Sequence, residues 1–90
     1  MKNIDLQKQI EINTIKQDLI MMLSNSVNNE NTEYQEAVYK LNVLSLKNNS
    51  LTEIQESICD VIVEMVAIGD ASFDYGFLAR QFEKFNNNRI

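Results

Sequence analysis

Apolar side chains recur at helical spacing along almost the whole chain, and this periodicity predicts four helices. We expect them over about residues 4–26, 30–46, 51–68 and, from residue 70 or 72, to about 85. Proline is absent and only two glycines occur, so signals for turns between strands are scarce. The pattern therefore predicts an all-α, four-helix bundle-like fold. We expect residues 1–90 to form one helical domain, made of an N-terminal helix and loop (1–29) and three further helices (30–90).

Each of the first three helices carries one apolar stripe, which is typical of a helix that packs on a common core. The predicted stripes are Ile12, Ile15, Leu19, Met22 and Leu23; Tyr34, Ala37, Val38, Leu41 and Leu44; and Ile54, Ile58, Val61, Ile62 and Met65. Ser50 and Glu53 have the spacing of a capping box at the start of the third helix. Gly69 suits the left-handed position after its end. The remaining candidate N-caps are Asn29 or Asn31 for the second helix and Asp70 or Ser72 for the fourth.

The fourth helix has aromatic side chains on two sides. Tyr75, Leu78, Phe82 and Phe85 lie on one side, and Phe73 and Phe77 lie on nearly the opposite side. Two interpretations are open: the second side contacts another molecule, or the Phe73 end lies under a loop. A 90-residue chain has a thin core, and association is one way to bury more apolar surface. We therefore expect a homodimer that completes the bundle.

Composition and charge restrict the function. Eight basic against 13 acidic residues give a net charge of −5, which argues against direct nucleic-acid binding. The absence of histidine excludes a His-dependent triad or a zinc finger. As the single cysteine, Cys59 cannot form an internal disulfide, which fits a reducing compartment. Because no basic residue is near it in the sequence, we expect a small buried hydrophobe and not a nucleophile. The longest apolar run covers only residues 19–23, so we expect no membrane span, no targeting segment and a cytoplasmic location.

Acidic side chains follow the apolar stripes on the second and third helices. Glu33 and Glu36 belong to the second helix, and the third helix carries an acidic stripe of Glu53, Glu56, Ser57, Asp60 and Glu64. If these helices pack antiparallel, as a short connection favours, the two carboxylate groups face each other. Carboxylates are preferred ligands of Mg²⁺. The alternative is a solvated face, in which Glu36 and Lys40 form an ordinary i, i+4 pair.

Two short segments resemble the MazG-like all-α nucleoside triphosphate pyrophosphohydrolases. Residues 32–37 (Thr-Glu-Tyr-Gln-Glu-Ala) and 56–61 (Glu-Ser-Ile-Cys-Asp-Val) are similar to that family's two elements, Glu-x-x-Glu and Glu-x-x-Asp. Residues 80–90 are similar to the basic last helix of small phage members. The resemblance covers about residues 30–90. Ser57 departs from it, because the family has a glutamate there, and Glu53 or Glu56 would have to substitute.

The resemblance implies a reaction, a cofactor and a site. The reaction is Mg²⁺- or Mn²⁺-dependent hydrolysis of a nucleoside triphosphate between its α- and β-phosphates, which releases pyrophosphate. Glu33, Glu36 and Asp60 are the expected catalytic residues. Glu33, Glu36, Glu53, Glu56 and Asp60 are the candidate metal ligands, and Lys40, Arg80 and Lys84, with Lys47, are candidate phosphate contacts. Tyr34, Tyr39 and Tyr75 are candidates for stacking on a base, although core packing is the commoner role of such residues.

Two other functions fit the same sequence. The chain could be a non-catalytic relative that keeps the acidic groove as a binding surface. It could also be an unrelated acidic helical interaction protein, such as a small phage-encoded inhibitor. A change of thermal stability on Mg²⁺ binding would separate the first two hypotheses from the third, and turnover would separate an enzyme from a binding protein.

Overall fold

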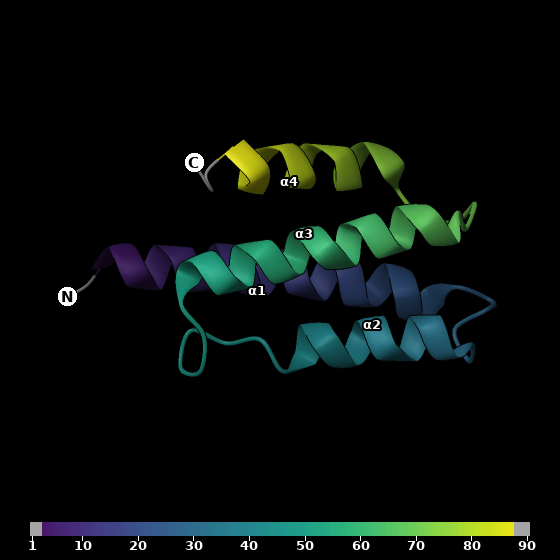
Figure 1. Cartoon of the computed structure of the whole chain (residues 1–90), viewed down its shortest axis with the longest axis horizontal. Coiled ribbons are helices and arrows are strands. Elements are labelled where there is room, and N and C mark those ends of the chain that lie inside the picture. The colour runs from purple at the N-terminus through teal and green to yellow at the C-terminus, as the bar shows by residue number, and fades with distance from the viewer. Residues whose placement is uncertain (1–2, 88–90) are drawn as a thin grey trace.

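The computed structural model describes residues 3–87 and has four α-helices in that range (Figure 1). They are α1 (Asn3–Asn25), α2 (Thr32–Asn42), α3 (Leu51–Ile68) and α4 (Tyr75–Asn87). No strand occurs in the described part of the chain. The predicted all-α fold is therefore confirmed, whereas the boundaries of α2 and α4 differ from the expected ones.

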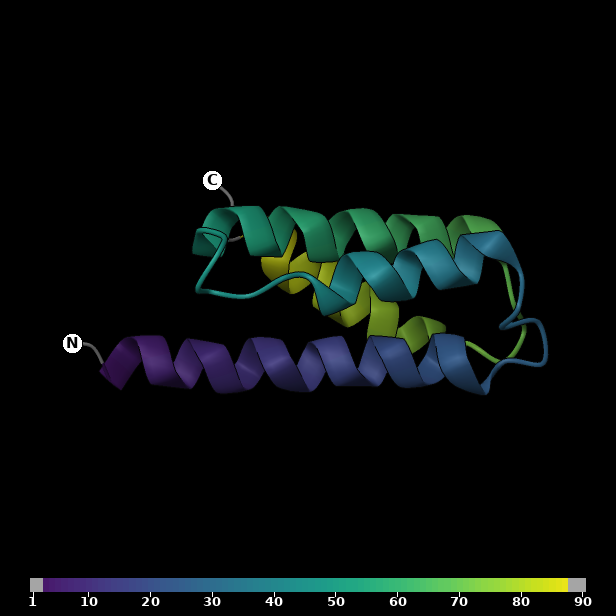
Figure 2. The same ribbon diagram turned by 90° about the horizontal axis from the view of Figure 1, so that it is seen from below.

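Each helix runs antiparallel to the one before it, and α3 lies between α2 and α4 (Figure 1). Helix α1 packs against α2, and its first turns extend beyond the ends of the other three helices (Figure 2). The antiparallel order places the start of α2 beside the end of α3. This arrangement decides which carboxylates of the two helices meet.

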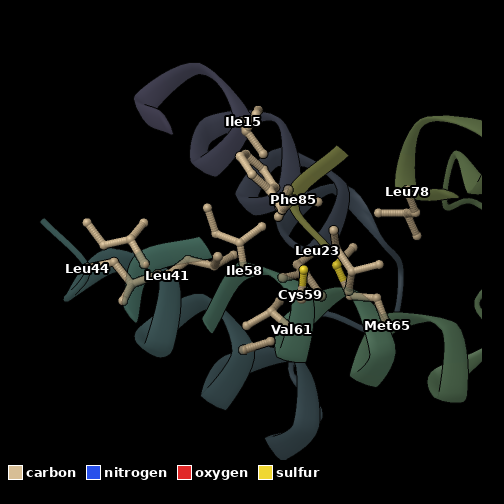
Figure 3. Close-up of a cluster of buried hydrophobic side chains, with 14 of the residues drawn as sticks. Ile15, Leu23, Leu41, Leu44, Ile58, Cys59, Val61, Met65, Leu78 and Phe85 are labelled. Atoms are coloured by element: carbon tan, nitrogen blue, oxygen red, sulfur yellow. The ribbon is translucent and has the colours of Figure 1, made fainter. Parts of the chain in front are cut away.

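The core is one cluster of apolar side chains to which every helix contributes (Figure 3). Ile15 of α1, Leu41 of α2, Ile58 of α3 and Phe85 of α4 are among its buried members. The three predicted stripes are confirmed, because all their residues are buried except Met22 and Val38, which are partly buried against the cluster. Each fully buried aliphatic or aromatic side chain contributes roughly 1.5–3 kcal/mol relative to an exposed one.

Helix α2 ends four residues before the predicted end at Leu46. Lys16 of α1 is buried, and its Nζ donates a 2.6 Å hydrogen bond to the carbonyl oxygen of Leu44. Burial lowers the pKa of Lys16. Asn49 Oδ1 accepts a bond from the amide of Ser45, so the segment after α2 forms a turn instead of another helical turn. The side-chain bonds of Lys16 and Asn49 replace the backbone bonds that a longer helix would make.

Both predicted ends of α3 are confirmed. The capping box is complete, because Ser50 Oγ accepts a bond from the Glu53 amide while Glu53 Oε1 accepts one from the Ser50 amide. Gly69 follows the helix with φ 71° and ψ 27°, a conformation in which a β-carbon would be strained. Asn31 is the N-cap residue of α2, as predicted, although its side chain makes no capping hydrogen bond.

The predicted N-cap of the fourth helix, Asp70 or Ser72, is wrong. Helix α4 begins at Tyr75, and Asp74 is its cap, since Asp74 Oδ1 accepts a 3.1 Å bond from the Phe77 amide. Phe73 precedes the helix and is buried, with its ring centroid 5.9 Å from that of Tyr34. Phe77 is half-buried and packs against the core cluster. Both Phe73 and Phe77 therefore contact the core of the chain, and Phe73 does so from the loop between α3 and α4 by packing on Tyr34 of α2.

Candidate functional site: the groove between α2 and α3

Two adjoining hollows follow the seam between α2 and α3. One, of about 280 Å³, is lined by Glu33, Glu36, Lys40, Glu64, Ala67 and Ile68. The other, of about 560 Å³, is lined by Lys40, Val43, Leu44, Ser57, Asp60, Val63 and Glu64. Both hollows share Lys40 and Glu64. We call their polar lining, Glu33, Glu36, Lys40, Ser57, Asp60 and Glu64, the acidic groove.

The antiparallel packing divides the predicted metal ligands. Glu33, Glu36 and Asp60 line the acidic groove, as the sequence pattern predicts. Glu53 and Glu56 lie nearer the start of α3 and are not among the groove-lining residues. The Glu53 carboxylate accepts a 2.8 Å hydrogen bond from the Ser50 amide and thereby caps the start of α3.

Glu64 is the groove carboxylate that the predicted ligand set left out. It lies one turn after Asp60 on α3, on the acidic stripe that the sequence analysis describes, and it lines both hollows. The spacing of Asp60 and Glu64 could have indicated this position. It was not decisive because spacing alone does not tell which end of the stripe faces Glu33 and Glu36.

Lys40 lies in the middle of the acidic groove. Its Nζ donates a 2.6 Å hydrogen bond to Glu64 Oε2 and forms an ion pair with it. This bond, together with the charges of Glu64, Glu36 and Asp60, raises the pKa of Lys40. The side chains of Lys40 and Glu64 are 50% and 41% exposed, and exposed pairs of this kind contribute only about 0–1 kcal/mol.

The lining of the groove can be tested against the divalent cation that the family resemblance implies. The raised pKa of Lys40 means that the groove stabilises positive charge, and its oxygen donors are of the kind that Mg²⁺ prefers. Within residues 3–87, however, no three acidic or thiol side chains converge closely enough to hold a metal ion. The groove therefore has oxygen donors of the kind that Mg²⁺ prefers, but as the described side chains lie they do not form a metal-binding group.

The predicted phosphate contacts on α4 lie away from the groove. Lys84 forms an ion pair with Glu11 of α1, and Arg80 is exposed on α4. Neither lines the acidic groove, because α4 packs on a different side of α3 from α2. Of the basic candidates, only Lys40 lies in the groove; Lys47 is exposed in the loop that connects α2 to α3.

The tyrosines that could stack on a base have different surroundings. Tyr34 is only 2% exposed, and its ring packs against Phe73. It therefore belongs to the core, the role that the sequence analysis gave as the commoner one. Tyr39 on α2 is 68% exposed. Tyr75 is partly exposed, and its hydroxyl donates a 2.6 Å bond to the carbonyl oxygen of Asp70.

A second polar cluster, directly after the C-terminal end of α3, was not predicted. Asp70 Oδ2 accepts 2.5 Å bonds from Ser26 Oγ and from the Tyr34 hydroxyl, and Oδ1 accepts bonds from the amide and the hydroxyl of Ser72. We call these residues, Ser26, Tyr34, Asp70 and Ser72, the Asp70 junction. The bonds from Ser26, Tyr34 and Ser72 hold the pKa of Asp70 well below its usual range, and the bond to Asp70 raises that of Tyr34.

The Asp70 junction has a structural role. It links the end of α1, the first turn of α2 and the loop between α3 and α4, and four donors already occupy the carboxylate. No local sequence pattern marks it, since Ser26 and Asp70 are 44 residues apart. Cys59 is also structural: it is 1% exposed and part of the core cluster, in line with its predicted role as a small hydrophobe.

Comparison of the chain with protein-family models, with curated proteins and with solved structures found no match. No helix in the part of the chain that the structure describes has the length and apolar character needed to cross a membrane.

Proposed function

We propose that this chain is a cytoplasmic, MazG-like nucleoside triphosphate pyrophosphohydrolase whose site is the acidic groove. The observation that carries the proposal is that Glu33 and Glu36 of α2 and Asp60 and Glu64 of α3 line adjoining hollows around Lys40. Glu33, Glu36 and Asp60 come from the two segments that resemble the family motifs, and Glu64 follows Asp60 by one helical turn. A bound Mg²⁺ would neutralise phosphate charge and help to activate water.

The chain's own residues have distinct roles in this proposal. Glu33, Glu36, Asp60 and Glu64 supply the negative field that would hold Mg²⁺ or Mn²⁺ in the groove. Lys40 supplies the one groove-lining ammonium that can contact the phosphates of the substrate. Val43, about half exposed at one end of the groove, is available to contact the base or sugar.

Release of pyrophosphate across a panel of ribo- and deoxyribonucleoside triphosphates, with Mg²⁺ or Mn²⁺, tests the proposal. We expect release that depends on the metal and that is lost in Asp60→Asn. A protein that releases no pyrophosphate from any nucleotide, yet binds Mg²⁺, would contradict the enzymatic proposal.

Ser57 provides a more sensitive version of the same test. It lines the groove beside Asp60 at the position where the family resemblance expects a glutamate. Ser57→Glu should raise Mg²⁺ affinity and increase pyrophosphate release if the site lacks a ligand. If Glu64 already fills that role, the added carboxylate should repel its neighbours and activity should fall. Both proteins should be measured side by side.

A second candidate is a non-catalytic acidic binding protein with the same groove, for example one that binds a basic segment of a partner. Ser57 favours it, because a hydroxyl is a weaker Mg²⁺ ligand than a carboxylate. The position of Lys40 also favours it, since the groove already binds an ammonium group at 2.6 Å. Mg²⁺-dependent stabilisation without turnover, together with binding of a lysine-rich peptide that competes with Mg²⁺, would support this candidate.

We also propose that the protein is a homodimer, formed through the outer apolar surface of α3 and α4. Ile62, Val63, Val66, Tyr75, Ala79 and Phe82 line an open apolar hollow there. Val63 and Val66 are each more than half exposed. Sedimentation equilibrium at micromolar concentration should give about twice the 10.4 kDa chain mass for the wild type and the chain mass for Val66→Asp. A wild-type monomer would contradict the proposal.

A further inference from the structure

The exposed surface of α1 carries no charge between residues 6 and 25. The exposed side chains in this range are all apolar or neutral polar: Leu6, Gln7, Gln9, Ile10, Asn13, Thr14, Gln17, Met21, Ser24 and Asn25. The charged residues of the same range are all half-buried or buried: Lys8, Glu11, Lys16 and Asp18. The exposed face of a helix in a soluble protein normally carries charged side chains, as the exposed faces of α2, α3 and α4 do. Helix α1 is therefore an exception among the four helices.

Three large apolar side chains lie along this neutral surface. Leu6, Ile10 and Met21 are 59%, 57% and 57% exposed. At about 100° per residue they share one sector of the helix with Asn13 and Gln17, opposite the buried stripe of α1. In Figure 2 the other three helices all lie on one side of α1, and its first turns extend beyond them. We call Leu6, Ile10, Asn13, Gln17 and Met21 the outer stripe of α1.

A second copy of this chain is the partner whose chemistry fits the outer stripe. Each chain has a net charge of −5, so two copies repel each other wherever their acidic faces meet, and a neutral face avoids this repulsion. The amide side chains of Asn13 and Gln17 both donate and accept hydrogen bonds, so the same residue types can pair with one another across a two-fold axis. A basic partner would find no carboxylate on this face.

We propose that α1 pairs with α1 of a second copy, in antiparallel orientation, through the outer stripe. With the two-fold axis between Asn13 and Thr14, Leu6 of one copy lies opposite Met21 of the other, and Ile10 lies opposite Gln17. The first turn of each α1, whose Leu6 is mostly exposed in its own chain, then packs on the half of the other helix that its own bundle supports. Both copies contribute the same residues, so the contact closes at two copies.

This contact is separate from the dimer contact proposed on α3 and α4, and it is weaker. It covers three large apolar side chains per copy along a single pair of helices, which is typical of a small, transient interface. The outer stripe and the apolar hollow between α3 and α4 belong to different helices, so both can be covered at once. A concentrated solution should then contain pairs of dimers. The proposal does not depend on the pyrophosphohydrolase activity.

Sedimentation equilibrium at low micromolar and at about 500 µM chain concentration tests the pairing, because a small interface should form only in the upper range. In Val66→Asp, which lacks the proposed contact on α3 and α4, the mass should rise from that of one chain toward twice that value. The mass of wild type should also double between the two concentrations. Ile10→Glu should abolish the rise in either background, since it places a carboxylate within the neutral stripe.

Two further variants separate the stripe from a general effect of charge. Gln17→Glu is nearly isosteric and should weaken the association, because the new carboxylate faces Ile10 of the second copy. Thr52→Glu is the matched control: it adds the same charge at an exposed position in the first turn of α3, outside the stripe, and should leave the rise in mass unchanged.

Disulfide cross-linking tests the orientation of the two helices. When Leu6→Cys and Met21→Cys proteins are mixed and oxidised with oxidised glutathione, the mixed dimer should form faster than either dimer of one variant. The native Cys59 is 1% exposed and should not react. Faster linking of Leu6→Cys with itself would overturn the antiparallel register.

The sedimentation results decide between the two contacts. A constant mass of Val66→Asp over the whole range would overturn the pairing of α1, and so would a rise that Ile10→Glu keeps or that Thr52→Glu removes. A wild type that is monomeric at low micromolar concentration would contradict only the contact on α3 and α4. Its mass should then still double in the upper range, and loss of that rise in Ile10→Glu would support the pairing of α1.

Discussion

The Asp70 junction, at the C-terminal end of α3, and the acidic groove, along the side of α3, differ in how their carboxylates are neutralised. Four hydrogen bonds from three segments of the chain converge on the single carboxylate of Asp70. In the acidic groove, four carboxylates share one ammonium group, Lys40, and only Glu64 bonds to it directly.

This difference indicates which carboxylates hold the fold and which are available for a ligand. A carboxylate has about four acceptor sites, so one that accepts four hydrogen bonds, as Asp70 does, is stabilised as an anion and has no lone pair left for another partner. Carboxylates that gather without enough donors repel one another and stabilise an added cation. Substitutions in the Asp70 junction should therefore change the stability of the fold, and substitutions in the acidic groove should change ligand binding.

The largest effect is expected from Asp70→Asn. An asparagine side chain offers one acceptor oxygen and an amide group that faces hydroxyl donors, so the bonds from Ser26, Tyr34 and Ser72 cannot all be kept. We expect the melting temperature to fall by on the order of 10 °C, the scale of a broken polar network in a domain of this size. Asp74→Asn is the matched control, because asparagine is as good an N-cap as aspartate and should change little. Equal melting temperatures for the two variants would remove the structural role of Asp70.

The pH dependence of the melting temperature should also show the structural role of the Asp70 carboxylate. The pKa of Asp70 is depressed in the folded protein, so its contribution to stability is fully present above the unfolded pKa of about 3.9 and is lost as pH falls further, toward the folded pKa. Between pH 5 and pH 2 the melting temperature of wild type should fall more steeply than that of Asp70→Asn. Parallel curves for the two proteins would show that the charge of Asp70 does not stabilise the fold.

Asp60→Asn, in contrast to Asp70→Asn, should affect metal binding and not the stability of the metal-free protein. Because Asp60 lies among Glu36, Glu64 and other groove residues, removal of its charge relieves repulsion, and the metal-free protein should keep or raise its melting temperature. Stabilisation by millimolar Mg²⁺ should disappear. A strong loss of stability without metal would instead show that Asp60 is a structural residue. The proposal that the acidic groove binds a metal ion would then lose its main support.

The smallest effect is expected from Glu64→Gln in the absence of metal. The ion pair with Lys40 is about half exposed, and such pairs contribute about 0–1 kcal/mol, so the melting temperature should change by less than about 5 °C. Circular dichroism at 222 nm during thermal melting is sufficient for this measurement. A larger fall of the melting temperature would show that the Lys40–Glu64 ion pair stabilises the fold, as the hydrogen bonds of the Asp70 junction do.

Much of the fold follows from local sequence patterns. The stripes of α1, α2 and α3 could be predicted because burial selects apolar residues at the spacing of a helix. The ends of α3 could be predicted because Ser50, Glu53 and Gly69 act within one turn of their own positions. Residues 33, 36 and 60 could be placed in one groove because short connections favour antiparallel neighbours.

Tertiary structure alone decided the rest, because those features depend on partners far apart in the sequence. Lys16 reaches Leu44 from α1, and this bond accompanies the early end of α2. Asp70 accepts hydrogen bonds from Ser26 and Tyr34, and Asp74 instead caps the start of α4. Glu64 joins the groove because the antiparallel offset of α2 and α3 brings it to Lys40. Periodicity determines which face of a helix is buried, but only packing determines which residues of two polar edges meet.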